Sequence, residues 1–175
     1  MTGSRLQLIY AKARVAPLKT QTLPRLELQV ALIGSNCVEA LCQQLRLPVT
    51  SVIARTDSLT AWHWIQRPAH HWRTLVANRV AAIQAVNRKC NVTWRHCPGT
   101  QNPADIASRG SLTRKLKTEW LEVPAWLTNK TQWPPAAPKG APTEQNRDSM
   151  KQDPTQINSL STEVPWWEKY PGGLK

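Results

Sequence analysis

The fold of this chain is decided by residues 49–65, VTSVIARTDSLTAWHWI. Residues 49–54 are mostly apolar and rich in β-branched side chains, which is typical of a short buried strand. Asp57 and Ser58 then begin a helix that we expect to run to about Ile65, since both residue types are favoured at helix starts. The carboxylate of Asp57 is therefore expected at the junction between a strand and the helix that follows it.

The segments on either side alternate between strand and helix patterns. A helix beginning at Pro24 is indicated by apolar residues at steps of three and four, namely Leu26, Val30, Ile33, Cys37, Leu41 and Leu45. The other expected elements are a strand over 6–15, a helix with an apolar face over 75–86, a strand over 91–97 and a short helix from Asn102 to Gly110. This order predicts an α/β domain with a mixed or parallel sheet.

The positive charge is concentrated in the first two thirds of the chain. Residues 1–118 hold 17 Lys and Arg but only four acids, a net charge of +13, whereas residues 119–175 carry a net charge of −1. We therefore expect a basic domain over 1–118, a Trp- and Pro-rich extension over 119–134, and a linker or disordered tail over 135–175. Clustered positive charge favours a nucleic-acid partner.

Three of the four acids in this basic part stand at chemically suggestive positions. Glu27 lies early in the first helix, Asp57 follows a strand, and Asp105 begins the last short helix. Carboxylates that converge from separate elements can bind Mg²⁺, and two divalent ions can activate water and neutralise a leaving oxygen in phosphodiester hydrolysis. We predict that the three side chains share one metal site.

Each acid also has a simpler interpretation. Glu27 can stabilise a helix N-terminus through the helix dipole. Asp57 can be an N-cap, and Asp105 can belong to a capping arrangement with Asn102. The metal hypothesis depends on the three occurring together, in this order, in a region otherwise almost free of acids.

Several segments resemble the ribonuclease H region of Pao/Bel-type LTR retrotransposon polyproteins. They are KARVAPLKTQTLPRLELQVAL, VIARTDSLTAWHWI, WRTLVANRVAAIQ, WRHCPGTQNPADIASRG and WLEVPAWLTNKTQWP, within residues 6–134. The resemblance implies a ribonuclease H fold, a five-stranded mixed sheet flanked by helices. It also implies cleavage of RNA in RNA–DNA hybrids with Mg²⁺ or Mn²⁺, and Glu27, Asp57 and Asp105 as catalytic metal ligands. The reverse transcriptase region upstream in such polyproteins is a candidate partner.

The chain departs from that family in one respect. The family places a fourth carboxylate on its first strand, whereas residues 1–26 contain neither Asp nor Glu. We therefore expect an N-terminally truncated fragment that lacks the first two strands and shows no ribonuclease H activity by itself. A non-catalytic nucleic-acid-binding remnant is the alternative. An aspartic peptidase is disfavoured, because Asp57-Ser58 is followed by Leu59 instead of Gly.

Candidate phosphate-binding residues are spread over the basic part. They are Arg25, Arg55, Arg73, Arg79 and Arg109. Trp62, Trp64 and Trp72 could stack on nucleotides, but their spacing in a core without Phe favours packing. The sequence contains neither a signal-peptide pattern nor a long apolar run, so we expect an intracellular protein without a membrane partner.

Overall fold

The computed structural model describes residues 8–18, 20–45, 48–105 and 124–135. Its elements are α1 (Leu23–Gln44), β1 (Val52–Thr56), α2 (Leu59–Gln66), η1 (Ala69–His71), α3 (Thr74–Cys90), β2 (Val92–His96), η2 (Gly99–Gln101), α6 (Ala125–Thr128) and η4 (Lys130–Gln132). Helices and strands follow one another in the order expected of an α/β chain, which confirms the predicted fold class at that level.

The strands β1 and β2 form a parallel pair in which Arg55 lies opposite Arg95. The pairing continues past the end of β1, because the amide of Cys97 donates to the carbonyl oxygen of Thr56 at 2.9 Å. A parallel pair requires a crossover connection. Here α2, η1 and α3 provide it, so that the segment 49–65 supplies both a strand and the start of its crossover.

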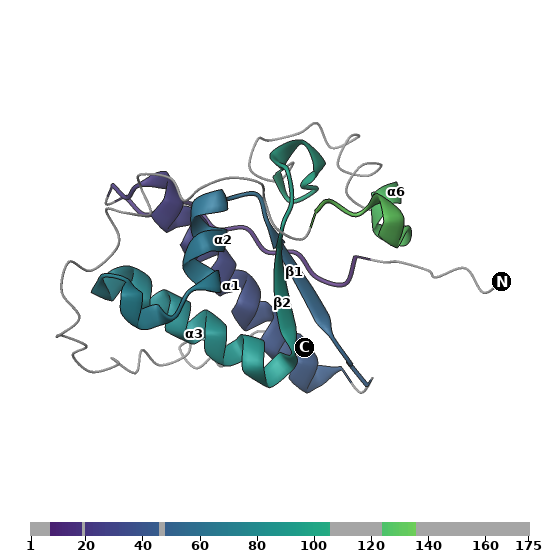
Figure 1. Cartoon of the computed structure of the whole chain (residues 1–175), viewed down its shortest axis with the longest axis horizontal. Coiled ribbons are helices and arrows are strands. Elements are labelled where there is room, and N and C mark those ends of the chain that lie inside the picture. The colour runs from purple at the N-terminus through teal and green to yellow at the C-terminus, as the bar shows by residue number, and fades with distance from the viewer. Residues whose placement is uncertain (1–7, 19, 46–47, 106–123, 136–175) are drawn as a thin grey trace.

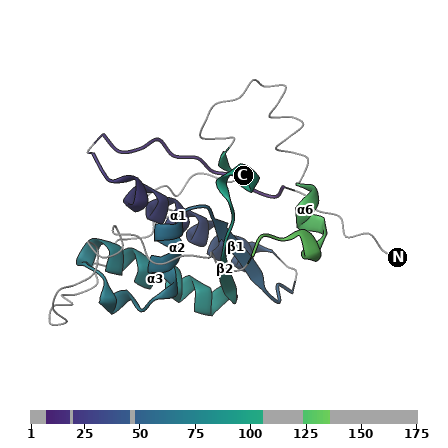
Figure 2. The same cartoon turned by 45° about the horizontal axis from the view of Figure 1, so that its top comes forward.

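The helices α1, α2 and α3 lie on one side of the strands, and α6 lies on the other (Figures 1 and 2). Side chains alternate between the two faces of a strand. Ala54 and Trp94 pack with the core on the side of the three helices. Arg55 and Arg95 project to the opposite side, where both guanidinium groups lie over the ring of Trp133.

The core lies between the three helices and the sheet. Trp64 and Trp72 are each 1% exposed and meet edge to face, with ring centroids 6.4 Å apart. The indole of Trp72 donates to the carbonyl oxygen of Trp64 at 3.1 Å. Packing, and not nucleotide stacking, is thus the role of these two residues. Trp62 is half-buried against the same cluster.

Local sequence signals set where the helices begin and end. Pro24 stands in the first turn of α1, where its missing N–H is not needed. Ser58 caps α2 by accepting a hydrogen bond from the amide of Ala61 at 3.1 Å. Asn91 ends α3 in the left-handed conformation, with φ of 49°, which Asn tolerates better than most residues.

The strand predicted over 6–15 is wrong for the residues that the structure describes. Residues 8–15 are not in a strand, and the side chain of Val15 is 96% exposed. Alternation of apolar residues forms a strand only where another strand supplies backbone partners, and β1 and β2 pair with each other instead. The strand predicted over 49–54 forms, but at 52–56. Residues 6–7, the end of the short helix after Asp105 and the tail from 136 lie outside the described residues.

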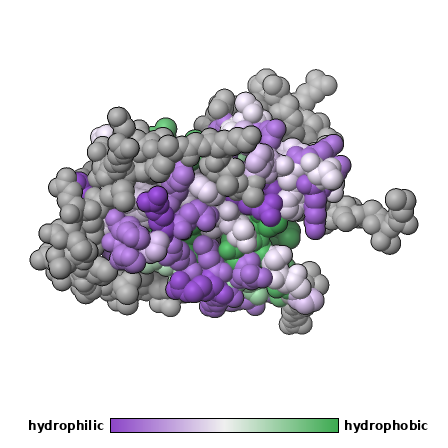
Figure 3. Space-filling model, in the orientation of Figure 1, coloured by the Kyte–Doolittle hydropathy of each residue, from purple (hydrophilic) through white to green (hydrophobic). Residues whose placement is uncertain are grey.

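The surface is largely hydrophilic on the face shown in Figure 3, with one apolar patch near the strands. Exposed apolar side chains on and beside β1 include Val49 and Ile53. In the described part of the chain, no helix has the length and apolar character that crossing a bilayer requires.

Candidate metal centre and nucleic-acid interface

A cavity of about 550 Å³ lies between α1 and the strands. We call it the carboxylate cavity, because Glu27, Asp57 and Asp105 all line it. Arg55 lines it as well, and much of the remaining wall is apolar α1 surface. The structure therefore brings the three sequence-predicted acids to one space, although they come from three separate elements.

Asp57 stands directly after β1, at the end of the strand that faces η2. A Cβ atom placed on Gly99 would lie 3.7 Å from Asp57 Oδ2, so the start of η2 borders this carboxylate. His96 Nε2 donates to the backbone carbonyl oxygen of Asp57 at 3.3 Å. The N-cap of α2 is Ser58, which leaves the carboxylate of Asp57 without that role.

Glu27 reaches the same cavity from α1. Its carboxylate accepts a hydrogen bond from the hydroxyl of Ser58, which ties α1 to the start of α2. Burial raises the pKa of Glu27, the Ser58 hydrogen bond opposes this, and the negative charge of Asp57 raises it further. Glu27 lies beyond the first turn of α1, so stabilisation of the helix N-terminus does not explain it.

Asp105 lines the carboxylate cavity from the turn after η2. The turn before it is held by Asn102, whose side-chain oxygen accepts from the amide of Ala104 at 3.1 Å. The amide of Asp105 also donates to the carbonyl oxygen of Asn102 at 3.2 Å, so this turn agrees with the capping arrangement that the sequence also allowed. Among the residues that the structure describes, no three His, Cys, Asp or Glu side chains lie close enough together to hold one metal ion. The close pair is Glu27 and Asp57.

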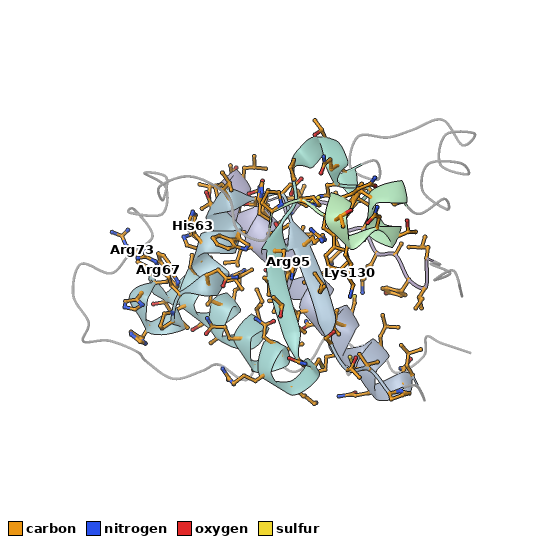
Figure 4. The ribbon with its side chains drawn as sticks, turned by 45° about the vertical axis from the view of Figure 1, so that its right-hand side comes forward. His63, Arg67, Arg73, Arg95 and Lys130 are labelled. Carbon is orange, nitrogen blue, oxygen red and sulfur yellow. The ribbon has the colours of Figure 1, made fainter. Side chains whose placement is uncertain are left out.

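The predicted phosphate-binding arginines are not gathered in one place. Arg55 lines the carboxylate cavity, and Arg25 is half-buried on α1. Arg79 is used inside the fold, since its Nε donates to Gln29 Oε1 at 2.7 Å and joins α3 to α1. Arg73 lies well away from Arg95 (Figure 4). Arg109 is outside the described residues.

Sequence reasoning missed a second cavity, of about 180 Å³, on the other side of the sheet. We call it the arginine cavity; its walls include Arg55, Cys97, Pro103, Trp126 and Trp133. The Arg55 guanidinium lies 4.9 Å from the ring centroid of Trp126 and 5.0 Å from that of Trp133. An arginine at an equivalent position of each strand, Arg55 and Arg95, was a signal in the sequence for a positively charged site. The two tryptophans that complete the cavity come from a distant segment, and no local pattern links them to the arginines.

Comparison with known families adds an independent result. A family model described as the Pao retrotransposon-like RNaseH-like domain matches residues 2–58. Over those residues, about a third of the chain, the sequence is similar to that ribonuclease H-like family. The Pao match covers Glu27 and Asp57 and stops before Asp105. No curated protein and no solved structure matches the chain.

Divalent-metal dependence is general among ribonuclease H-like domains, and the donor chemistry here fits it. Mg²⁺ is commonly held by one or two carboxylates together with waters and substrate phosphates. Glu27 and Asp57 supply two such carboxylates in one cavity, and the charge of Asp57 disfavours ionisation of Glu27. A cation between them would remove that conflict, so the pair fits a hard divalent ion.

Proposed function

We propose that this chain binds RNA–DNA hybrids through a ribonuclease H-like domain with an incomplete metal centre, and that the polypeptide by itself does not cleave them. The observation that carries the proposal is the convergence of Glu27, Asp57 and Asp105 on one cavity. That cavity belongs to a part of the chain with a net charge of +13, which suits a polyanionic partner.

The proposal extends to the fold. We assign β1 and β2 to a ribonuclease H-like mixed sheet flanked by helices. Support comes from the Pao match over residues 2–58 and from the parallel direction of the two strands. The position of Asp57 directly after β1 agrees with a site at the carboxyl end of the sheet.

Within this proposal each side chain has a distinct role. Glu27 and Asp57 would hold Mg²⁺ or Mn²⁺, and Asp105 would add a third negative charge to the lining of the same cavity. When bound, the ion supplies positive charge at the phosphate to be cleaved. Ser58 orients Glu27 through its hydrogen bond, whereas the guanidinium group of Arg55 lies on the other side of the sheet, over Trp126 and Trp133.

The expected lack of cleavage follows from the number of carboxylates. The chain has no acidic residue among positions 1–26, so it supplies three carboxylates where the family uses four. With only Glu27 and Asp57 close together, the ion would lack ligands on one side. Binding of nucleic acid does not depend on that ligand, because it relies on Lys and Arg contacts to phosphate.

The test is a labelled RNA–DNA hybrid incubated with the protein and Mn²⁺, with filter binding at several salt concentrations. We expect binding that weakens steeply with salt and no cleavage. Arg73→Gln, at an exposed position, should weaken binding, whereas the Lys89→Gln variant removes an equal charge that Glu39 already neutralises and should change binding less. Cleavage that Asp57→Asn abolishes would show that the three carboxylates suffice, and the proposal of inactivity would be wrong.

A further inference from the structure

Arg55 and Arg95 form an unusual pair on the side of the sheet that faces α6. They lie opposite each other in register, on strands that are about 4.8 Å apart in such pairs. Two like charges on adjacent strands repel each other. The repulsion between Arg55 and Arg95 therefore destabilises the folded protein unless nearby groups offset their positive charge.

The protein supplies only part of that compensation. In the part of the chain that the structure describes, the buried Nη1 and Nη2 of Arg55 and Nε of Arg95 have no hydrogen-bond acceptor. The indole rings of Trp126 and Trp133 attract the guanidinium groups, but a ring face accepts no strong hydrogen bond. Leaving buried donors of this kind unpaired destabilises the folded state, and more so when the donors are charged.

Residues 124–135, which lie over Arg55 and Arg95, are held together by hydrogen bonds of their own. The indole of Trp133 donates to the carbonyl oxygen of Leu127 at 3.2 Å, and Asn129 accepts from the amide of Thr131 at 3.1 Å. These bonds fold residues 124–135 into a compact cover on the Arg55 side of the strands. Figure 4 shows Lys130 on this segment and Arg95 on its strand.

The size of the arginine cavity restricts its ligand. Its volume is about 180 Å³. Pockets for drug-sized ligands are larger, about 300–1,000 Å³. The cavity therefore suits one small group with acceptor oxygens and negative charge, and a guanidinium fork matches the oxygens of phosphate.

Resting on the proposed function, we infer that the arginine cavity binds a phosphodiester group of a nucleic-acid strand, with Arg55 as the direct donor and Arg95 as a second positive charge. Arg55 lines both cavities and stands two residues before Asp57, with its guanidinium group on the α6 side of the sheet. Residues 102–105 contribute to both cavities and stand between them. The inference therefore adds a second contact point to the hybrid-binding surface.

The first test measures hybrid affinity for Arg55→Gln and Arg95→Gln, with Arg88→Gln as the matched control on the exposed end of α3. We expect Arg55→Gln to weaken binding about tenfold and to make the salt dependence shallower by about one phosphate contact. Arg95→Gln should weaken binding about threefold, and the control less than about twofold. Arg55→Lys keeps the charge but not the fork, so it should retain the salt slope and lose affinity.

The second test uses the wild-type protein and inorganic phosphate, followed by NMR of the arginine Nε–H groups. We expect the signals of Arg55 and Arg95 to shift while that of Arg88 does not. If phosphate shifts them but the wild type binds no hybrid, the proposed function fails and the oxyanion site stands. If hybrid affinity is the same in wild type, Arg55→Gln and Arg95→Gln, the cavity holds an adventitious ion only and the inference is overturned. Absence of any phosphate shift also overturns it.

Discussion

The two cavities beside β1 differ in charge, size and origin, although both are lined by Arg55. The carboxylate cavity is built by α1, the end of β1 and the turn before Asp105. Its acidic side chains favour binding of a cation. The arginine cavity is built by the opposite side of the strands and by Trp126 and Trp133 from a distant segment. Its unpaired arginine N–H groups favour binding of an anion. A single short strand thus separates two sites of opposite charge.

The difference also concerns stability. The helices and the carboxylate cavity share the side of the sheet that carries the hydrophobic core. On the arginine side, Trp126, Leu127 and Trp133 lie over the strands, and none of them belongs to that core. We therefore expect core substitutions to unfold the protein, and substitutions on the arginine side to alter binding first.

The largest expected effect is a difference in the free energy of unfolding between a substitution on the core side of the sheet and one on the arginine side. Trp64→Ala removes a fully buried ring and should lower the free energy of unfolding by about 3–5 kcal/mol. Trp133→Ala removes a half-buried ring that contacts two guanidinium groups, and should cost less than about 2 kcal/mol. Urea unfolding followed by circular dichroism measures both. Equal losses would break the comparison, because the tryptophan cover would then belong to the core.

A smaller effect is expected at the link between α1 and α2. Ser58→Ala removes the N-cap of α2 and the hydrogen bond to Glu27, and should cost about 1–2 kcal/mol. Ser51→Ala, at an exposed position before β1, is the control and should be nearly neutral. Ser58→Ala should also raise the pKa of Glu27 further, because the hydrogen bond from Ser58 lowers that pKa in the wild type. An unchanged stability would show that this link does not hold the carboxylate cavity together.

The smallest effect concerns the pH dependence of stability. Because the pKa of Glu27 is raised in the folded protein, mainly by burial, the folded state binds its proton more tightly than the unfolded state does. Its contribution to stability is therefore fully present below the unfolded pKa and is lost as pH rises through the folded pKa. Glu27→Gln should remove this loss and stabilise the protein at pH 7, by less than about 1 kcal/mol after solvent screening.

Unfolding titrations of both proteins across that pH window provide the check. We expect the advantage of Glu27→Gln to shrink as pH falls toward the ordinary range of a glutamate. If wild type and variant show the same pH dependence, the carboxyl group is not perturbed in the way that its burial and Asp57 require.

Much of the carboxylate side could be predicted from sequence. The signals for α1, β1, α2, α3 and β2 are local, and an acid directly after a strand is easily placed at the sheet end. The strand expected over 6–15 failed because its apolar pattern says nothing about whether a partner strand is present. The cover formed by Trp126 and Trp133 could not be predicted, since its contacts with Arg55 and Arg95 join segments without any local pattern.

The most direct test of the metal centre is a calorimetric titration of the wild-type protein with MnCl₂ beside two variants. Asp57→Asn removes a carboxylate from the cavity, and Glu39→Gln removes one that is paired with Lys89 elsewhere. We predict weak, saturable binding that persists in Glu39→Gln and disappears in Asp57→Asn. Identical binding in all three proteins, or none in the wild type, would contradict a cation site at Glu27 and Asp57.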